Sequence, residues 1–115
     1  MHTVLFTSVF QRQAATAGLT DDEVQDIAVA IAADPLSGDL MPGTGGARKL
    51  RFARARGGKS GGYRTIHYYW GDDVPVFLLA LIDKRQRENL SAAEKNELAR
   101  ILPQIADAYR KGSKT

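Results

Sequence analysis

The sequence contains no cysteine and only two histidines, which narrows the chemistry available to it. Without cysteine there can be no disulfide, thiolate metal site or cysteine nucleophile, and the composition fits a reducing cytoplasm. Two histidines without carboxylates at metal-ligand spacing argue against a metal site, and we expect no cofactor. The longest apolar run, Val74–Ile82, is nine residues long and includes Pro75, far short of a membrane span. The apolar stretch near the start is also too short and too soon interrupted for a signal peptide.

Acidic residues are missing from one long segment, Thr44–Arg64, and this absence is the most informative feature of the chain. The segment carries seven basic residues, namely Arg48, Lys49, Arg51, Arg54, Arg56, Lys59 and Arg64. The whole chain has 16 basic and 13 acidic residues, so the remainder holds 9 basic and 13 acidic residues, a net charge of −4. The positive excess is therefore local. A concentrated positive field with interspersed glycines and aromatic residues is typical of a protein that binds a polyanion such as nucleic acid.

A length of 115 residues, 43% of them hydrophobic, fits one globular domain spanning residues 1–115. Apolar spacing predicts the helices, and capping boxes at Thr20–Glu23 and Ser91–Glu94 open the second and the last of them. Alternation and β-branched or aromatic content predict the strands. In order, the predicted elements are a strand Thr3–Phe6, a helix Ser8–Ala17, a helix from Thr20 to Asp34, strands Arg48–Arg54, Tyr63–Trp70 and Val74–Ile82, and a helix from Ser91. This order predicts an α+β domain with two N-terminal helices, an antiparallel-rich sheet of about four strands and a C-terminal helix.

Several local features refine this prediction. The almost unbroken apolar run Val74–Ile82 predicts a central strand covered on both faces. Gly71–Asp73 should form a tight turn before it, and Gly57–Gly62 a flexible connection. Pro103 lies inside the apolar stripe of the last helix and should kink or split that helix. We expect residues 111–115 to be a frayed tail.

Two of the predicted strands can bring cations together. Lys49 and Arg51 share a face of one strand, and Arg64 can approach them if the next strand pairs with it. Such a cluster could cut RNA without a metal, because the 2′-hydroxyl of RNA can attack the neighbouring phosphate. A lysine whose pKa is depressed by nearby cations could take the proton, and an arginine could hold the phosphate. His67 is on the opposite face from Arg64 and is expected to be packed rather than catalytic. A merely solvated basic face is the alternative.

Sequence motifs then suggest a family. They are Gly43–Arg51 (GTGGARKLR), Gly58–Arg64 (GKSGGYR), Val76–Leu79 (VFLL), and Lys84 followed by Asn89–Ser91 (NLS). In these motifs the chain resembles the HigB branch of the RelE-like toxins of bacterial type II toxin–antitoxin systems. The resemblance extends from about Asp34 to the last helix. It implies a small α+β domain with a curved antiparallel sheet flanked by helices.

The resemblance also implies a function. Such toxins are generally ribosome-dependent endoribonucleases, or mRNA interferases, which cut mRNA in the A site by the 2′-hydroxyl attack described above. Carried over by motif, the catalytic residues are Lys49, Arg51, Arg64 and Lys84. We expect the neighbouring cations Arg48, Arg54, Arg56, Lys59 and Arg85 to bind RNA or the ribosome. The implied protein partner is a helix-turn-helix, HigA-like antitoxin, through which the toxin would reach operator DNA.

The chain departs from this branch just after the last predicted strand. The branch often has Tyr-x-Lys-Asn-Glu there, whereas this chain has Ile82-Asp83-Lys84-Arg85-Gln86. A tyrosine that could stack on a base is therefore absent, Arg85 adds a cation, and Asp83 could pair with Lys84. Two alternatives stay open: a toxin of this fold that acts on a protein target, and a module or inactive remnant that binds nucleic acid without cleaving it.

Overall fold

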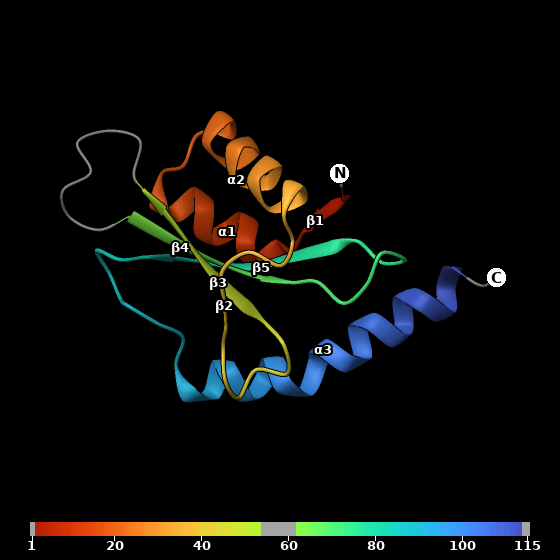
Figure 1. Ribbon diagram of the computed structural model, residues 1–115. Helices are drawn as coiled ribbons and strands as arrows, with labels where there is room; N and C mark the ends of the chain where they lie inside the picture. Colours follow the sequence, from red (N-terminus) through yellow and green to blue (C-terminus); the bar gives the residue numbers. More distant parts are fainter. Residues whose placement is uncertain (1, 54–61, 114–115) are drawn as a thin grey trace.

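The computed structural model describes residues 2–53 and 62–113 of the chain (Figure 1). Within these ranges the elements are, in order, β1 (Val4–Phe6), α1 (Ser8–Ala17), α2 (Asp21–Ala33), β2 (Asp39–Leu40), β3 (Arg48–Ala53), β4 (Gly62–Tyr68), β5 (Val76–Asp83) and α3 (Ala92–Ser113). This confirms the predicted α+β class and the predicted order of helices. The predicted flexible connection lies outside the described residues except for Gly62, which begins β4.

The strands form one sheet in the order β1-β5-β4-β3-β2. β1 pairs with β5 in parallel, and the other neighbours are antiparallel. All eight residues of β5 are buried, which confirms the prediction of a central strand covered on both faces. The described sheet has five strands rather than about four, because β2, only two residues long, pairs with β3. A strand of two exposed residues has no apolar alternation that could identify it in the sequence.

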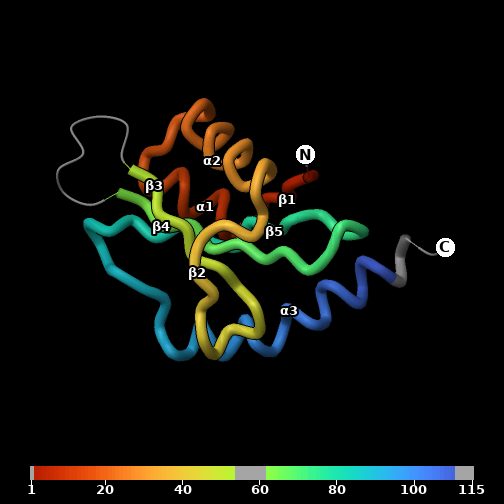
Figure 2. The backbone as a smooth tube through the Cα atoms, in the orientation of Figure 1, coloured from red at the N-terminus to blue at the C-terminus, as the bar shows by residue number. Residues whose placement is uncertain are grey.

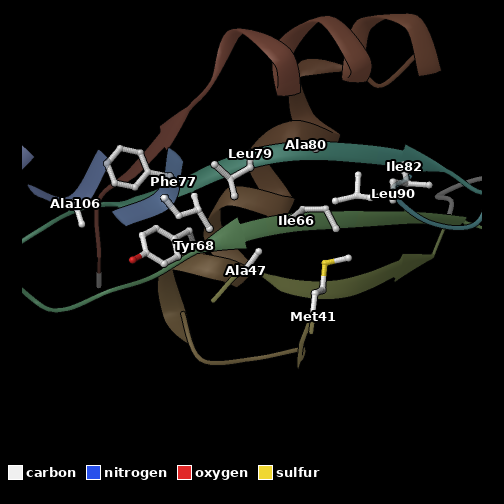
Figure 3. Close-up of a cluster of buried hydrophobic side chains, with 11 residues drawn as sticks. Met41, Ala47, Ile66, Tyr68, Phe77, Leu79, Ala80, Ile82, Leu90 and Ala106 are labelled. Atoms are coloured by element: carbon white, nitrogen blue, oxygen red, sulfur yellow. The ribbon is translucent and has the colours of Figure 1, made fainter. Parts of the chain in front are cut away.

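Helices cover both faces of the sheet. Figure 1 shows α1 and α2 on one side and α3 on the other. Beneath α1 and α2 lies a core that includes Phe10, Ile31 and Leu78, each fully buried. The second core lies on the α3 face, where Ile66 of β4 and Ile82 of β5 pack with Leu102 of α3; Figure 3 shows most of this cluster. Burial of apolar area in two cores supplies the main stabilisation of the fold.

The helix starts are fixed by side chains, as the sequence predicts. In α2, the Thr20 hydroxyl accepts from the Glu23 amide while the Glu23 carboxylate accepts from the Thr20 amide. In α3, Ser91 and Glu94 make the same reciprocal pair, at 3.1 and 2.8 Å. Both capping boxes are therefore confirmed. α1 ends as predicted at Gly18, whose φ of 82° is the left-handed conformation that favours glycine.

The last helix is continuous across Pro103 and runs to Ser113. It is not split, and Figures 1 and 2 show that its axis changes direction along its length, as expected for a helix with an internal proline. α3 therefore includes residues 111–113 of the segment expected to be frayed. No helix among the described residues is long and apolar enough to cross a membrane.

The connection between β4 and β5 is wider than the predicted tight hairpin. A turn is present, in which the Val74 amide donates to the Gly71 carbonyl at 3.3 Å, but β4 already ends at Tyr68. The side chains of the next two residues have partners outside the strand. The Tyr69 hydroxyl donates to Asp72, and the guanidinium of Arg110 lies 3.8 Å above the Trp70 ring.

His67 is a core residue, as expected. Its side chain is fully buried beside a register shift between β4 and β5, and Nε2 donates to the Pro35 carbonyl at 2.9 Å. Burial lowers the pKa of His67, and the charge of Arg48 lowers it further, against the opposing effects of the Pro35 hydrogen bond and Asp34. The imidazole therefore prefers to be neutral in the folded protein.

This depressed pKa makes stability depend on pH. As pH falls through about 6.5, the unfolded chain binds a proton at His67 while the folded chain resists it, so the free energy of unfolding should fall. His67→Gln, which can still donate to Pro35, should flatten this fall between about pH 7.5 and 5.5. Urea unfolding at several pH values measures this dependence of the free energy of unfolding on pH. Wild type and His67→Gln differ only at this position, so the difference between their slopes reports His67 alone. If the plots of unfolding free energy against pH were parallel for wild type and His67→Gln, the prediction would be contradicted.

Gly38 holds β2 against β3 and tolerates no side chain. Its φ is 84°, and a Cβ there would lie 2.5 Å from the Lys49 carbonyl oxygen. Gly18 has a similar φ of 82° but open space around the Cβ position, so it isolates the backbone effect. Gly18→Ala should cost roughly 1–2 kcal/mol, and Gly38→Ala roughly 3 kcal/mol because the clash adds to the strain. Chemical denaturation of the two variants measures the difference, and equal losses would show that Gly38 is not tightly packed.

Candidate functional site

The pairing of β3 with β4 brings the predicted cations together. Arg51 lies directly opposite Arg64 in the antiparallel register, and Lys49 lies opposite Ile66, two residues further along β4. This confirms the prediction that the two basic strands pair and that Arg64 approaches Lys49 and Arg51. Lys49, Arg51 and Arg64 are called the cation cluster below. Like charges directly opposite one another destabilise a sheet, so an anion bound between them would relieve a cost built into the fold.

The cation cluster lies on the α3 face of the sheet. Ile66, the partner of Lys49, is part of the core under α3, and so is Ile82, the partner of Arg64 in β5. Since alternate residues of a strand point to opposite faces, Lys49 and Arg51 point to this side as well. Leu50, between them, packs instead in the core beneath α1 and α2. The prediction that Lys49 and Arg51 share one face of the strand is therefore confirmed.

The cluster combines exposure with partial burial. Arg51 is exposed, whereas Lys49 and Arg64 are half-buried. The Nε of Arg64 is shielded from solvent and has no hydrogen-bond partner among the described residues. A shielded donor without an acceptor costs free energy, which an incoming phosphate oxygen would recover. The arrangement suits a ligand that brings negative charge to Arg64.

The surroundings of Lys49 favour its neutral form. Partial burial, followed by the charges of Arg64, Lys95 and Arg51, lowers the pKa of Lys49, and only Asp39 acts in the opposite direction. Asp39 belongs to β2 and lies opposite Lys49 in the sheet register. A lysine with a lowered pKa beside an arginine that can hold a phosphate is a pair suited to general-base chemistry.

Lys95 is a residue of this site that the sequence did not reveal. It lies in the first turn of α3, where its backbone amide donates to Ser91. The only signal in the sequence is its spacing from Leu98 and Leu102, which places it on the apolar side of the helix. Which face of the sheet that side covers is a property of the tertiary fold.

Lys84, the fourth predicted catalytic residue, lies at the end of β5. Its backbone amide donates to the Gly62 carbonyl at 3.2 Å, beside the start of β4, and its side chain is half-buried. Ile82, two residues earlier, is the sheet partner of Arg64. The backbone of Lys84 therefore lies at the same end of the sheet as Arg64. Asp83, which could have paired with Lys84, forms an ion pair with Arg85.

The cations predicted to bind RNA or the ribosome fall into two groups. Arg85 makes a two-pronged ion pair with the buried Asp83, with contacts of 3.2 and 2.9 Å. Arg48 donates to the carbonyls of Leu36 and Gly38, at 2.9 and 3.3 Å, and so fastens the segment around β2. Both side chains thus have partners within the fold, and their role in RNA binding stays a prediction. The other predicted binding cations, Arg54, Arg56 and Lys59, lie outside the described residues.

Metal-ligating side chains do not gather at the cation cluster. Within residues 2–53 and 62–113, no group of three histidines or carboxylates is placed to hold a metal ion. The titratable groups that surround Lys49 are the cations and the single carboxylate already described. The chemistry that these residues can perform is proton transfer and binding of an anion.

Comparison with known families agrees with this arrangement. A family model described as the RelE toxin of the RelE/RelB toxin–antitoxin system matches residues 2–113, almost the entire chain. The match includes both basic strands, the β5 strand and α3. It confirms the resemblance to RelE-like toxins that the sequence motifs suggest. The chain therefore belongs to the RelE toxin family and is a toxin of a toxin–antitoxin system.

Proposed function

We propose that this toxin is a ribosome-dependent endoribonuclease that cleaves mRNA and so stops translation. The observation that carries the proposal is the cation cluster: three cations on one sheet face, with a shielded, unpartnered Nε on Arg64 and a lowered pKa at Lys49. Membership of the RelE toxin family supports a ribosome-related action. The motif resemblance to the HigB branch supports the same reading and suggests a HigA-like, helix-turn-helix antitoxin as the partner.

The proposed reaction uses the RNA's own 2′-hydroxyl. Lys49, in its neutral form, takes the proton of that hydroxyl, and the oxygen attacks the adjacent phosphorus. Arg64 binds the phosphate oxygens, on which negative charge builds up as the fifth bond forms. The bond to the 5′-oxygen then breaks, and this oxygen takes a proton for which Arg51 and Lys84 are the candidate donors. The products are a 2′,3′-cyclic phosphate and a free 5′-hydroxyl, so atoms and charge balance without water or metal.

The ribosome has a defined part in this proposal. A strand of RNA in solution rarely places its 2′-oxygen, phosphorus and 5′-oxygen in line, and alignment is a large part of the barrier. The exposed Arg51 and half-buried Lys49 and Arg64 form an open charged surface that can bind phosphate. A codon held by the ribosome would present its backbone to this surface in a fixed geometry.

Replacing Arg64 tests the proposal. Purified protein added to a translation extract should yield cut mRNA, whereas the same mRNA without ribosomes should stay intact. Arg64→Ala should lower the cleavage rate by about 100-fold or more, since it removes a donor to the developing charge. Primer extension on the mRNA measures the cuts.

Arg100→Ala is the matched control, because Arg100 is exposed on α3 and paired with Glu97. It should cleave like wild type, and both variants should unfold close to the wild-type midpoint, as expected for side chains that are not fully buried. Arrest of the extract with intact mRNA would point to a protein target. Binding of naked RNA with a steep salt dependence and no arrest would point to a binding module.

A further inference from the structure

The first turn of α3 carries a cation towards the sheet. The capping box of Ser91 and Glu94 fixes where the helix begins, and Lys95 is half-buried in the turn that follows. Leu98 and Leu102, three and seven residues later, pack in the core on the α3 face, and Leu102 is fully buried. Residues at these spacings share one side of a helix, so Lys95 lies on the side that faces the sheet.

A close backbone approach shows which segment this side of α3 packs against. A Cβ on Gly45 would lie 3.3 Å from the Cα of Ala99, one turn beyond Lys95. Gly45 belongs to the segment between β2 and β3, and its neighbours Met41 and Ala47 are buried in the α3-face core (Figure 3). Lys95 therefore starts from the side of α3 that packs against the connection between β2 and β3, and this connection leads into the strand that carries Lys49.

Four charged groups from four elements act on Lys49. Arg51 comes from its own strand, Arg64 from β4, Lys95 from α3, and Asp39 from β2. Of these, the three cations disfavour a further positive charge at Lys49, and the exposed Asp39 favours it. In the proposed reaction, Arg64 is assigned to the phosphate oxygens and Arg51 is a candidate proton donor to the leaving 5′-oxygen. Lys95 is the cation among the three that has no role in that reaction.

We propose that Lys95 is a positioning residue of this toxin: its ammonium group, carried by the first turn of α3, opposes a second ammonium at Lys49 and so keeps Lys49 available as the proton acceptor. The inference rests on the proposed function for its role in cleavage, but the effect of one lysine on the other is a property of the free protein. The lowered pKa of Lys49, with Lys95 among its causes, agrees with the geometry. Lys95 acts through Lys49 and need not touch the RNA.

Titration of Lys49 tests the inference directly. The signal of each lysine side chain can be followed against pH by NMR in protein carrying ¹³C-labelled lysine, and Lys49→Arg identifies the Lys49 signal by its loss. In Lys95→Met the midpoint of Lys49 should move to higher pH, and in Lys95→Arg it should stay low. Arg100→Met removes a cation from the outer side of the same helix and should leave it unchanged. An unchanged midpoint in Lys95→Met would overturn the inference.

The cleavage rate gives a second readout. In the translation extract, Lys95→Met should cut mRNA roughly two- to fivefold more slowly near neutral pH, as expected for losing one partly screened like charge, and should recover at higher pH. Lys95→Arg should match wild type. A shifted midpoint with an unshifted rate profile would overturn the role in cleavage. If wild-type protein cuts no mRNA, the proposed function fails, and the Lys49 titration still decides whether Lys95 acts on Lys49.

Discussion

The antiparallel register between β3 and β4 is the constraint on which the site depends. It sets Arg51 against Arg64 and places Lys49 beside them on the α3 face. A slip by one residue would turn these cations into the apolar core beneath α1 and α2, where Leu50 packs. Burial of apolar side chains on both faces therefore fixes the register. In that register the three cations point to the α3 side of the sheet. Their mutual repulsion is offset by the rest of the fold.

The placement of α3 is the second constraint, because this helix carries Lys95. Its start is fixed by the Ser91 capping box and its middle by burial of Leu102. Its far end is tied to the turn between β4 and β5, where Arg110 stacks on Trp70 and pairs with Asp73 at 2.8 Å. Three attachments along one bent helix hold its first turns beside the connection between β2 and β3. The geometry around Lys49 thus depends on contacts far from it in the sequence.

Features written in local sequence were predictable, and features that depend on tertiary placement were not. The capping boxes and the alternation of Lys49, Leu50 and Arg51 need only a few neighbouring residues, and both are confirmed. The short strand β2 was missed because it lacks a periodic pattern. Lys95 was missed because helical spacing shows that it faces a core but does not say which strands lie there. The sequence suggested Lys84 as a possible partner of Asp83, but sequence adjacency does not show that Arg85, two residues away, reaches the carboxylate.

A comparison of His67 with Lys49 shows why Lys49 rather than His67 is the proposed proton acceptor. Burial is the largest cause of the lowered pKa at both residues. His67, however, is sealed from solvent and donates its Nε2 proton to the Pro35 carbonyl, so its neutral form serves the core. Lys49 remains half-exposed on the same face as Arg64, and its neutral form is favoured by cations that also attract a phosphate. In the proposed reaction, the groups that bind the substrate would therefore also prepare the base, and a cluster of cations would take the place of a histidine pair.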